Sequence, residues 1–309
     1  MKALKKFFIG GLMTCTLFSA LGLTSCSGKY TTNEQEINER ITSVLIDTEI
    51  SDIAILSSEN GECKVVCYER PELEHSVTIT DGTLKIHQLD KRKWYQFIGL
   101  NFDNSKLTVY LPEGEYDMLK INGSTGDILV TDSFVFSSID ISNSTGDVKN
   151  YASASTRMKI STSTGDIDVK NTSAGSIELS ASTGDIELDG IECAGDIFVD
   201  STTGGKFLSD ITCQNLSIKS STGDMKLENI LAKTKLSIVG STGDVHFTDC
   251  DAGEIFVKVS TGDVKGTLLS EKIFIVDTSA GKTDVPKTTT GGVCEITTST
   301  GNIKITINE

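Results

Sequence analysis

Residues 163–188 read STGDIDVKNTSAGSIELSASTGDIEL, and this stretch contains one full copy of a unit that repeats along most of the chain. The tetrapeptide STGD begins at residues 124, 144, 163, 182, 221, 241 and 260, and the variants TTGG, SAGK and STGN occupy 202–205, 279–282 and 299–302. The repeat glycines follow one another every 19 or 20 residues, at positions 126, 146, 165, 184, 204, 223, 243, 262, 281 and 301. Chance does not keep such a period.

Each repeat carries two short stretches of alternating apolar and polar residues. One follows the glycine, as in Ile186-Glu187-Leu188, and the other precedes it, as in Ile177 and Leu179. Alternation with a period of two predicts strands with one buried face. A third apolar position lies seven residues after the glycine, at Ile191, Ile211, Ile230, Cys250 and Leu269.

A unit of about 20 residues cannot bury its apolar stripe alone, but stacked units form a continuous core. We therefore predict an all-β fold, a parallel β-solenoid of about ten coils of 19–20 residues, with a right-handed coil favoured. At roughly 4.8 Å per coil, the rod is about 43 Å long. A propeller needs about 40 residues per blade, and the leucine and asparagine pattern of a leucine-rich repeat is missing.

The STGD corner predicts a turn in which glycine allows positive φ and the small Ser and Thr let corners stack. Its aspartates form a column, for which we consider two roles. They could cap the turn by accepting backbone N–H groups, or they could bind Ca²⁺ between coils, although one carboxylate per corner is sparse for calcium. The column consists of Asp127, Asp147, Asp166, Asp185, Asp224, Asp244 and Asp263.

Some coils depart from the repeat. Gly205 and Lys206 replace the usual residues after Gly204, and 282–284 (Lys-Thr-Asp) do so after Gly281, so we expect local irregularity in both coils. Cys193 and Cys213 occupy equivalent positions of adjacent coils and could form a disulfide or a ladder of stacked thiols.

The N-terminus has the features of an export signal. Residues 1–25 combine three early lysines with an apolar run, and they end at Leu23-Thr24-Ser25-Cys26. This end resembles the lipobox of bacterial lipoproteins, which implies that Cys26 is acylated, for example with palmitate, and holds the chain on a membrane. An ordinary cleaved signal or a short membrane anchor is the alternative. Residues 26–41 are polar and predict a tether.

Residues 42–120 lack the repeat but alternate strongly, so we expect an N-terminal β module that caps the open end of the solenoid, with 121–309 forming the solenoid itself. Asp81-Gly82 predicts a hairpin turn. The aromatic residues of 94–98 (WYQFI) either plug the core or form an exposed loop that touches headgroups or a glycan. Cys63 and Cys67 are expected to be packed thiols, and His75, His87 and His246 to be solvated strand residues.

The composition limits the partners. The chain has 28 Lys and Arg against 43 Asp and Glu, a net charge of −15. Without a basic cluster it has no means of displacing counterions from phosphates, so no nucleic-acid partner is expected. We expect no cofactor.

Residues 110–128 (YLPEGEYDMLKINGSTGDI), the serial STGD coils and 288–305 (TTTGGVCEITTSTGNIKI) resemble the bacterial domain-of-unknown-function family known as putative adhesin. The resemblance implies a β-solenoid in the cell envelope and brings no catalytic residues.

We expect a non-catalytic, lipid-anchored protein on the cell membrane or outer membrane, facing the exterior or a periplasm. It would present its repetitive surface to a glycan or an envelope protein. The alternatives are a carbohydrate-active enzyme on a β-helix and an accessory protein of envelope stress or signalling.

Overall fold

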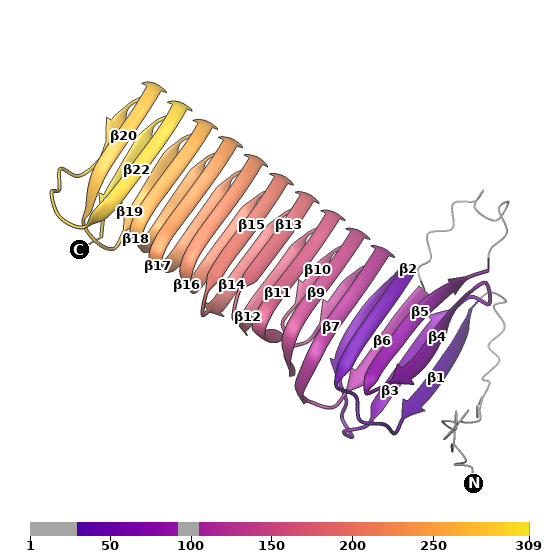
Figure 1. Ribbon diagram of the computed structural model, residues 1–309. Helices are drawn as coiled ribbons and strands as arrows, with labels where there is room; N and C mark the ends of the chain where they lie inside the picture. The colour runs from indigo at the N-terminus through magenta and orange to yellow at the C-terminus, as the bar shows by residue number, and fades with distance from the viewer. Residues whose placement is uncertain (1–29, 92–104, 309) are drawn as a thin grey trace, which may run out of the picture.

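The computed structural model describes residues 30–91 and 105–308, and within these residues every regular element is a β-strand. Figure 1 shows a row of stacked coils with a smaller group of strands at the N-terminal end. That group, which we call the cap, consists of β1 (Thr31–Ile37), β3 (Cys63–Glu69), β4 (Leu73–Thr80), β5 (Thr83–Asp90) and β6 (Ser105–Leu111). The predicted parallel β-solenoid is confirmed.

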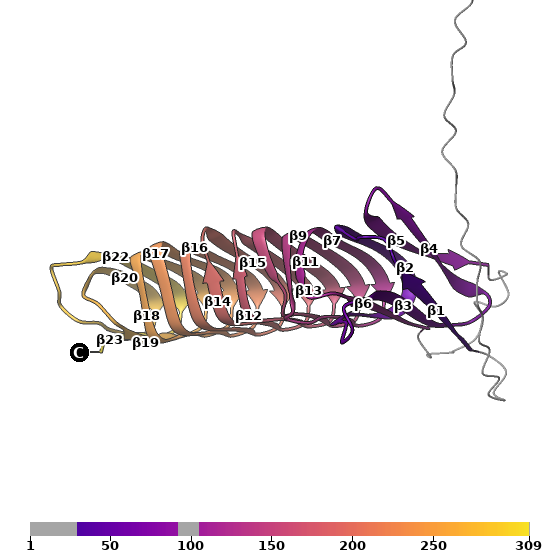
Figure 2. The ribbon, with the colours of Figure 1, turned by 90° about the horizontal axis from the view of Figure 1, so that it is seen from below.

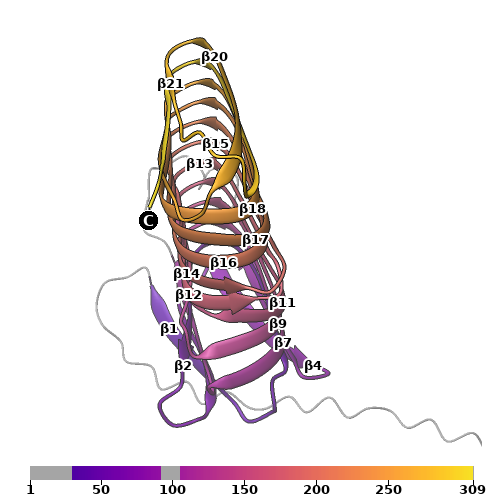
Figure 3. The same cartoon turned by 90° about the vertical axis from the view of Figure 1, so that its left-hand side faces the viewer.

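The coils are built from the remaining strands. These are β2 (Ser43–Ser57), β7 (Gly114–Thr125), β8 (Ile128–Val130), β9 (Phe134–Thr145), β10 (Val148–Asn150), β11 (Ser153–Thr164), β12 (Ile167–Ala174), β13 (Ile177–Thr183), β14 (Ile186–Cys193), β15 (Asp196–Thr203), β16 (Lys206–Thr222), β17 (Met225–Thr242), β18 (Val245–Thr261), β19 (Val264–Leu268), β20 (Lys272–Ala280), β21 (Thr283–Asp284), β22 (Gly292–Thr300) and β23 (Ile303–Ile307). Figure 3 looks along the stack and shows one coil behind another.

The inward columns follow the alternation of the sequence. Ile167, Ile186, Ile177 and Ile197 are each at most 1% exposed and lie in register with their counterparts one coil away. Glycine is required at the corner because the coils meet there through their backbones. At Gly165, where φ is +133°, an added Cβ would lie 2.1 Å from the carbonyl oxygen of Gly146.

The solenoid begins earlier than residue 121. β2 pairs in parallel with β7 and β8, so that Ile53 lies opposite Ile128, and it forms a first coil with its own corner at Ser51 and Asp52. The other edge of β2 pairs in parallel with β5 and β6 of the cap. The β4–β5 hairpin turns at Asp81 and Gly82, both with positive φ, as predicted.

β1 lies within residues 26–41, the segment interpreted as a tether. It pairs antiparallel with β3 from Thr31 to Ile37, so this part of the segment is a strand of the cap. Figure 2 shows β1 and β3 together at the end of the molecule that is remote from the C-terminus.

The last two coils are stacked out of chain order. β18 pairs with β22, not with β20, and β22 pairs in turn with β20. β19 likewise pairs with β23, and β23 with β21. The final segment, β22 and β23, is therefore inserted between β18 and β19 on one side and β20 and β21 on the other. As a result β20 lies outermost (Figure 1).

Two expectations about particular residues are wrong. The strand around Lys206 is regular, because Lys206 keeps the column position between Ile186 and Met225 and is fully buried. Leu269 is 44% exposed, and Leu268 takes the inward place because a register shift separates Phe247 from Cys250. The coil after Gly281 is irregular as expected, with β21 only two residues long.

Candidate functional site

The predicted aspartate column lies along one corner of the solenoid, and its carboxylates link neighbouring coils. Oδ1 of Asp127 accepts the backbone N–H of Asp147 at 2.9 Å, and Oδ1 of Asp147 accepts that of Asp166 at 2.9 Å. The same contact joins Asp166 to Asp185, Asp185 to Gly205, Asp224 to Asp244, Asp244 to Asp263 and Asp263 to Asn302. The first coil adds Asp52, which accepts the N–H of Asp127. One oxygen of each of these carboxylates thus accepts a hydrogen bond from the backbone of the corner in the neighbouring coil.

Other predicted positions fall outside the part of the chain that the structure describes. These are Cys26 with the signal peptide before it, and the aromatic stretch 94–98. Cys193 and Cys213 are both buried and free, without a disulfide between them.

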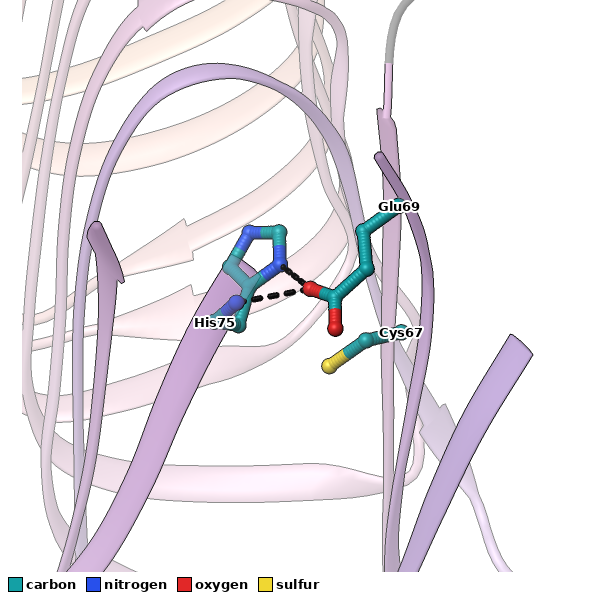
Figure 4. Close-up of side chains that lie close together, drawn as sticks. All are labelled: Cys67, Glu69 and His75. Atoms are coloured by element: carbon teal, nitrogen blue, oxygen red, sulfur yellow. Dashed lines mark hydrogen bonds and ion pairs between the residues drawn. The ribbon is translucent and has the colours of Figure 1, made fainter. Parts of the chain in front are cut away.

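A cluster of three unlike side chains lies inside the cap. Cys67 and Glu69 project from the same face of β3, and His75 from β4, and their donor atoms all lie within 4.8 Å of one another. Figure 4 shows that Glu69 accepts two hydrogen bonds from His75 and that the Cys67 thiol points toward the same carboxylate. The two bonds go to Oε2, from Nδ1 at 2.6 Å and from the backbone N–H at 2.7 Å.

A network of hydrogen bonds surrounds this cluster. Nε2 of His75 lies 3.1 Å from Oγ of Ser51, which also accepts a bond from Nε2 of Gln88 at 3.1 Å. Oε1 of Gln88 is held by the backbone N–H groups of Glu49 and Ile50. On the other side, Nδ2 of Asn33 donates to Oε1 of Glu69 at 2.6 Å. The network joins β1, β2, β3, β4 and β5.

Burial and hydrogen bonds together set the protonation of Glu69 and Cys67. Removal from water alone would raise the pKa of Glu69, but the hydrogen bonds from His75 and Asn33 outweigh it and hold that pKa below its ordinary value. Burial, reinforced by the charge of Glu69, raises the pKa of the Cys67 thiol to about 12. The carboxylate is therefore charged at neutral pH and the thiol is protonated.

His75 corrects a prediction, because its side chain is fully buried instead of solvated. Single-residue reasoning missed the cluster because each member lies in an unremarkable strand pattern. The available signal is Glu69, a carboxylate two residues after Cys67 and so on the inward face of the same strand. A buried carboxylate requires a hydrogen-bond donor, and His75 is the next side chain with an N–H donor after Arg70 in the sequence.

Ser51, His75 and Glu69 have the connectivity of a hydrolase triad, with a hydroxyl on Nε2 and a carboxylate on Nδ1. Ser51 is only 2% exposed, and its hydroxyl lies 2.7 Å from the carbonyl oxygen of Ile50. A nucleophile must reach its substrate, so this buried hydroxyl is unsuited to acyl transfer.

The interior of the solenoid holds a lysine. Nζ of Lys206 donates to the carbonyl oxygens of Gly204 at 2.5 Å and Thr222 at 3.3 Å, and to the hydroxyl of Ser220. Burial lowers the pKa of Lys206, partly offset by the charges of Asp185 and Asp224. With its ammonium group turned to the inside of the corner, Lys206 does not line a pocket on the outer surface of the solenoid.

A groove of about 560 Å³ lies near the C-terminal end of the solenoid. Asp251 in its wall accepts hydrogen bonds from Nζ of Lys272 at 2.6 Å and from Oγ of Ser270 at 2.9 Å. Next to it, Ile273 and Val293 are paired across β20 and β22, and both are about 40% exposed, while Ile275 is 55% exposed. We call Ile273, Ile275 and Val293 the distal apolar patch.

Comparison with known families gives a clear match. Residues 41–205 and 193–309 both match the family described as Toastrack DUF4097. The chain belongs to the Toastrack DUF4097 family. The resemblance found in the sequence is thereby confirmed, and the first match begins just before β2, where the solenoid also begins.

The Toastrack chain is also similar to solved structures. One is a putative adhesin from Bacteroides fragilis NCTC 9343, with 15% identity over 91% of this chain and 98% of that chain and a TM-score of 0.47. Another is a putative lipid binding protein from Parabacteroides distasonis ATCC 8503, with 17% identity over 90% and 98% and a TM-score of 0.48. A putative adhesin from the same strain gives 12% identity over 90% and 98% and a TM-score of 0.42. Among curated proteins no sequence matches.

Proposed function

We propose that this Toastrack protein is a non-catalytic, lipid-anchored protein of the bacterial cell envelope that presents the far end of its solenoid to a glycan or an envelope protein. The observation that supports this most is the polarity of the rod. The N-terminal strand β1 lies at one end, while β20 and β22 lie at the other (Figures 1 and 2). These two strands carry the distal apolar patch and part of the lining of the groove. A chain held by Cys26 would therefore present that patch away from its anchor.

The proposed anchor is close to the folded cap. Because Tyr30 is the first described residue and β1 starts at Thr31, the chain between Cys26 and Tyr30 spans 30 − 26 = 4 residue steps. Fully extended, these steps reach about 14 Å. A lipid on Cys26 would hold the cap near the membrane surface and limit the directions in which the rod can point. Within the described residues there is no helix of the length and apolarity that a membrane span requires.

The anchor is tested with Cys26→Ala. We expect the variant to lose acylation, as assayed by incorporation of labelled palmitate. We also expect it to move from the membrane fraction to the soluble fraction after cell breakage. Inhibition of lipoprotein signal processing should leave an unprocessed precursor. A processed Cys26→Ala chain that stays on the membrane would contradict lipid anchoring.

Binding by the far end is tested with a matched pair of substitutions. Ile275→Lys puts a charge into the distal apolar patch, whereas Val135→Lys puts one at a 40% exposed apolar position on β9, toward the cap. Each full-length variant is used to capture envelope glycans and proteins, with and without calcium. We expect Ile275→Lys to lose the captured ligand and Val135→Lys to keep it. Equal capture by both variants would exclude the patch as the binding site.

The non-catalytic part of the proposal rests on access. Catalysis needs two or three different groups that converge on one reacting atom. The cluster in the described chain that offers such groups, around His75, is buried, and the aspartates of the column repeat one corner contact from coil to coil. We expect no turnover of glycan, peptide or ester substrates. Activity that Ser51→Ala removes would overturn this.

A further inference from the structure

We propose that Cys67, Glu69 and His75 form a binding site for one divalent transition-metal ion of the zinc type. Thiolate sulfur, imidazole nitrogen and carboxylate oxygen are the three kinds of protein ligand that Zn²⁺ takes. Here one of each comes from two neighbouring strands, β3 and β4, and all three lie within 4.8 Å of one another (Figure 4).

The geometry requires only a small adjustment. Around a tetrahedral zinc ion with bonds of about 2.0–2.3 Å, ligand atoms lie roughly 3.3–3.6 Å apart. Nδ1 of His75 and Oε2 of Glu69 are 2.6 Å apart, so they would separate by less than about 1 Å as the metal replaces the proton between them. Because the donor atoms of all three residues lie within 4.8 Å of one another, the Cys67 sulfur would approach the other two by at most about 1.5 Å. Three protein ligands leave a fourth position for water.

Metal binding must release protons for the charges to balance. The thiol of Cys67 loses its proton to the solvent and becomes a thiolate. His75 binds through the lone pair of Nδ1 as a neutral imidazole with its proton on Nε2, so the Nδ1 proton passes to the solvent where Nε2 already carries one and otherwise moves to Nε2. The bound ion then carries two anionic ligands and one neutral ligand, which matches its charge.

The surrounding network already orients the ligands as metal sites require. A ligating histidine donates its second ring N–H to an oxygen acceptor, and Nε2 of His75 lies 3.1 Å from Oγ of Ser51. A ligating carboxylate is itself hydrogen-bonded, and Asn33 donates to Oε1 of Glu69 at 2.6 Å. Ser51 is steadied in turn by Gln88.

A simple buried ion pair between His75 and Glu69 explains less. It needs the carboxylate and the imidazole, but it gives no role to Cys67, whose thiol is buried, points at the carboxylate and makes no hydrogen bond among the described residues. A thiolate beside a charged carboxylate is unfavourable unless the two anions share a cation. A metal accounts for all three residues together.

The test uses the full-length chain in mild detergent, freed of metal with a chelator and then titrated with Co²⁺. We expect saturation at one equivalent, with the near-ultraviolet band of a thiolate–cobalt bond, and loss of that band when Zn²⁺ is added. Zn²⁺ should also raise the melting temperature, because the ion binds the folded state. A wild-type chain that shows no thiolate–cobalt band would refute the site whatever the variants do.

Cysteine variants identify the thiol. Cys63 lies four residues before Cys67 on the same face of β3 and is similarly buried. Cys67→Ser should abolish the thiolate–cobalt band, whereas Cys63→Ser should leave it unchanged. Ser51→Ala, which removes only the acceptor of Nε2, should weaken Zn²⁺ binding about 10- to 100-fold. A band that survives Cys67→Ser would place the metal elsewhere and contradict the proposal.

Discussion

Cys213→Ala should destabilise the protein at neutral pH and stabilise it at strongly alkaline pH. Cys213 is fully buried in the solenoid, and burial raises the pKa of its thiol from 9.0 to about 12, with smaller contributions from Cys193 and Asp196. In the unfolded chain the thiol loses its proton above pH 9, whereas in the folded chain it keeps it. The stability that this thiol contributes is therefore complete below pH 9 and is lost as the pH rises toward 12.

The size of the effect follows from the two pKa values. At pH 10 the unfolded state gains about 1.4 kcal/mol from ionisation of one such thiol, and at pH 11 about 2.7 kcal/mol. Removing the sulfur atom leaves a small void, which should cost about 1 kcal/mol at every pH, as for the loss of one buried methyl group. The stability curves of wild type and Cys213→Ala should cross near pH 10.

The assay is urea unfolding followed by circular dichroism from pH 7 to 11, with a phosphine reductant present. Ile211→Val, a buried residue two positions away on the same strand, is the control. It also loses one buried methyl group but has no proton to exchange, so its loss should stay at about 0.5–1.5 kcal/mol throughout. A loss for Cys213→Ala that is equally constant with pH would refute the reasoning.

Three further predictions concern the core. Ile167→Asp buries an unpaired carboxylate and should lower the free energy of unfolding by several kcal/mol. Glu187→Lys changes an outward, half-exposed side chain and should lower it by under about 1 kcal/mol. Similar urea midpoints for the two variants would mean that the inward register is wrong. Burial lowers the pKa of Lys206 in the folded chain below its ordinary value of 10.5, so between the folded and unfolded pKa values the unfolded chain binds one more proton. The free energy of unfolding should therefore rise with pH in this range, by up to about 1.4 kcal/mol per pH unit. Lys206→Met should remove this rise in the same pH series. Gly165→Ala would place Cβ 2.1 Å from a carbonyl oxygen and should unfold the coil. In Gly61→Ala the added Cβ meets no atom within 4 Å, so this variant should lose only about 1–2 kcal/mol of stability from the strain of positive φ. Equal melting temperatures for the two variants would contradict the corner geometry.

The sequence predicts the solenoid well because its fold depends on local, repeated rules. The spacing of the glycines and the alternation of Ile186 and Leu188 with Glu187 predict the inward positions of the regular coils once one coil is known. Lys206 breaks the pattern in sequence but not in structure. Its long side chain reaches past the core to the carbonyl oxygens at the corner, which a count of apolar residues cannot reveal.

The cap and its cluster depend on contacts between distant segments. Ser51 and His75 are joined by a hydrogen bond across 24 residues, and Asn33 reaches Glu69 across 36. Antiparallel pairing of β1 with β3 and parallel pairing of β2 with β5 decide these contacts, and neither pairing leaves a periodic trace in the sequence. The order of the last two coils is also hidden, because Gly281 and Gly301 keep the regular spacing of the repeat whichever coil lies outermost.

That order has a consequence for how the protein is made. A repetitive rod synthesised from its N-terminus could add one coil at a time as the chain emerges, but β18 must wait for β22, which arrives after β20. Until residues 292–307 emerge, β20 lacks the strand with which it pairs, and the edge of β18 is open to proteases and to other unfinished chains. The last segment therefore completes the C-terminal end of the sheet. A chain that stops before it leaves both β18 and β20 without the strand that lies between them, even if all earlier coils are folded.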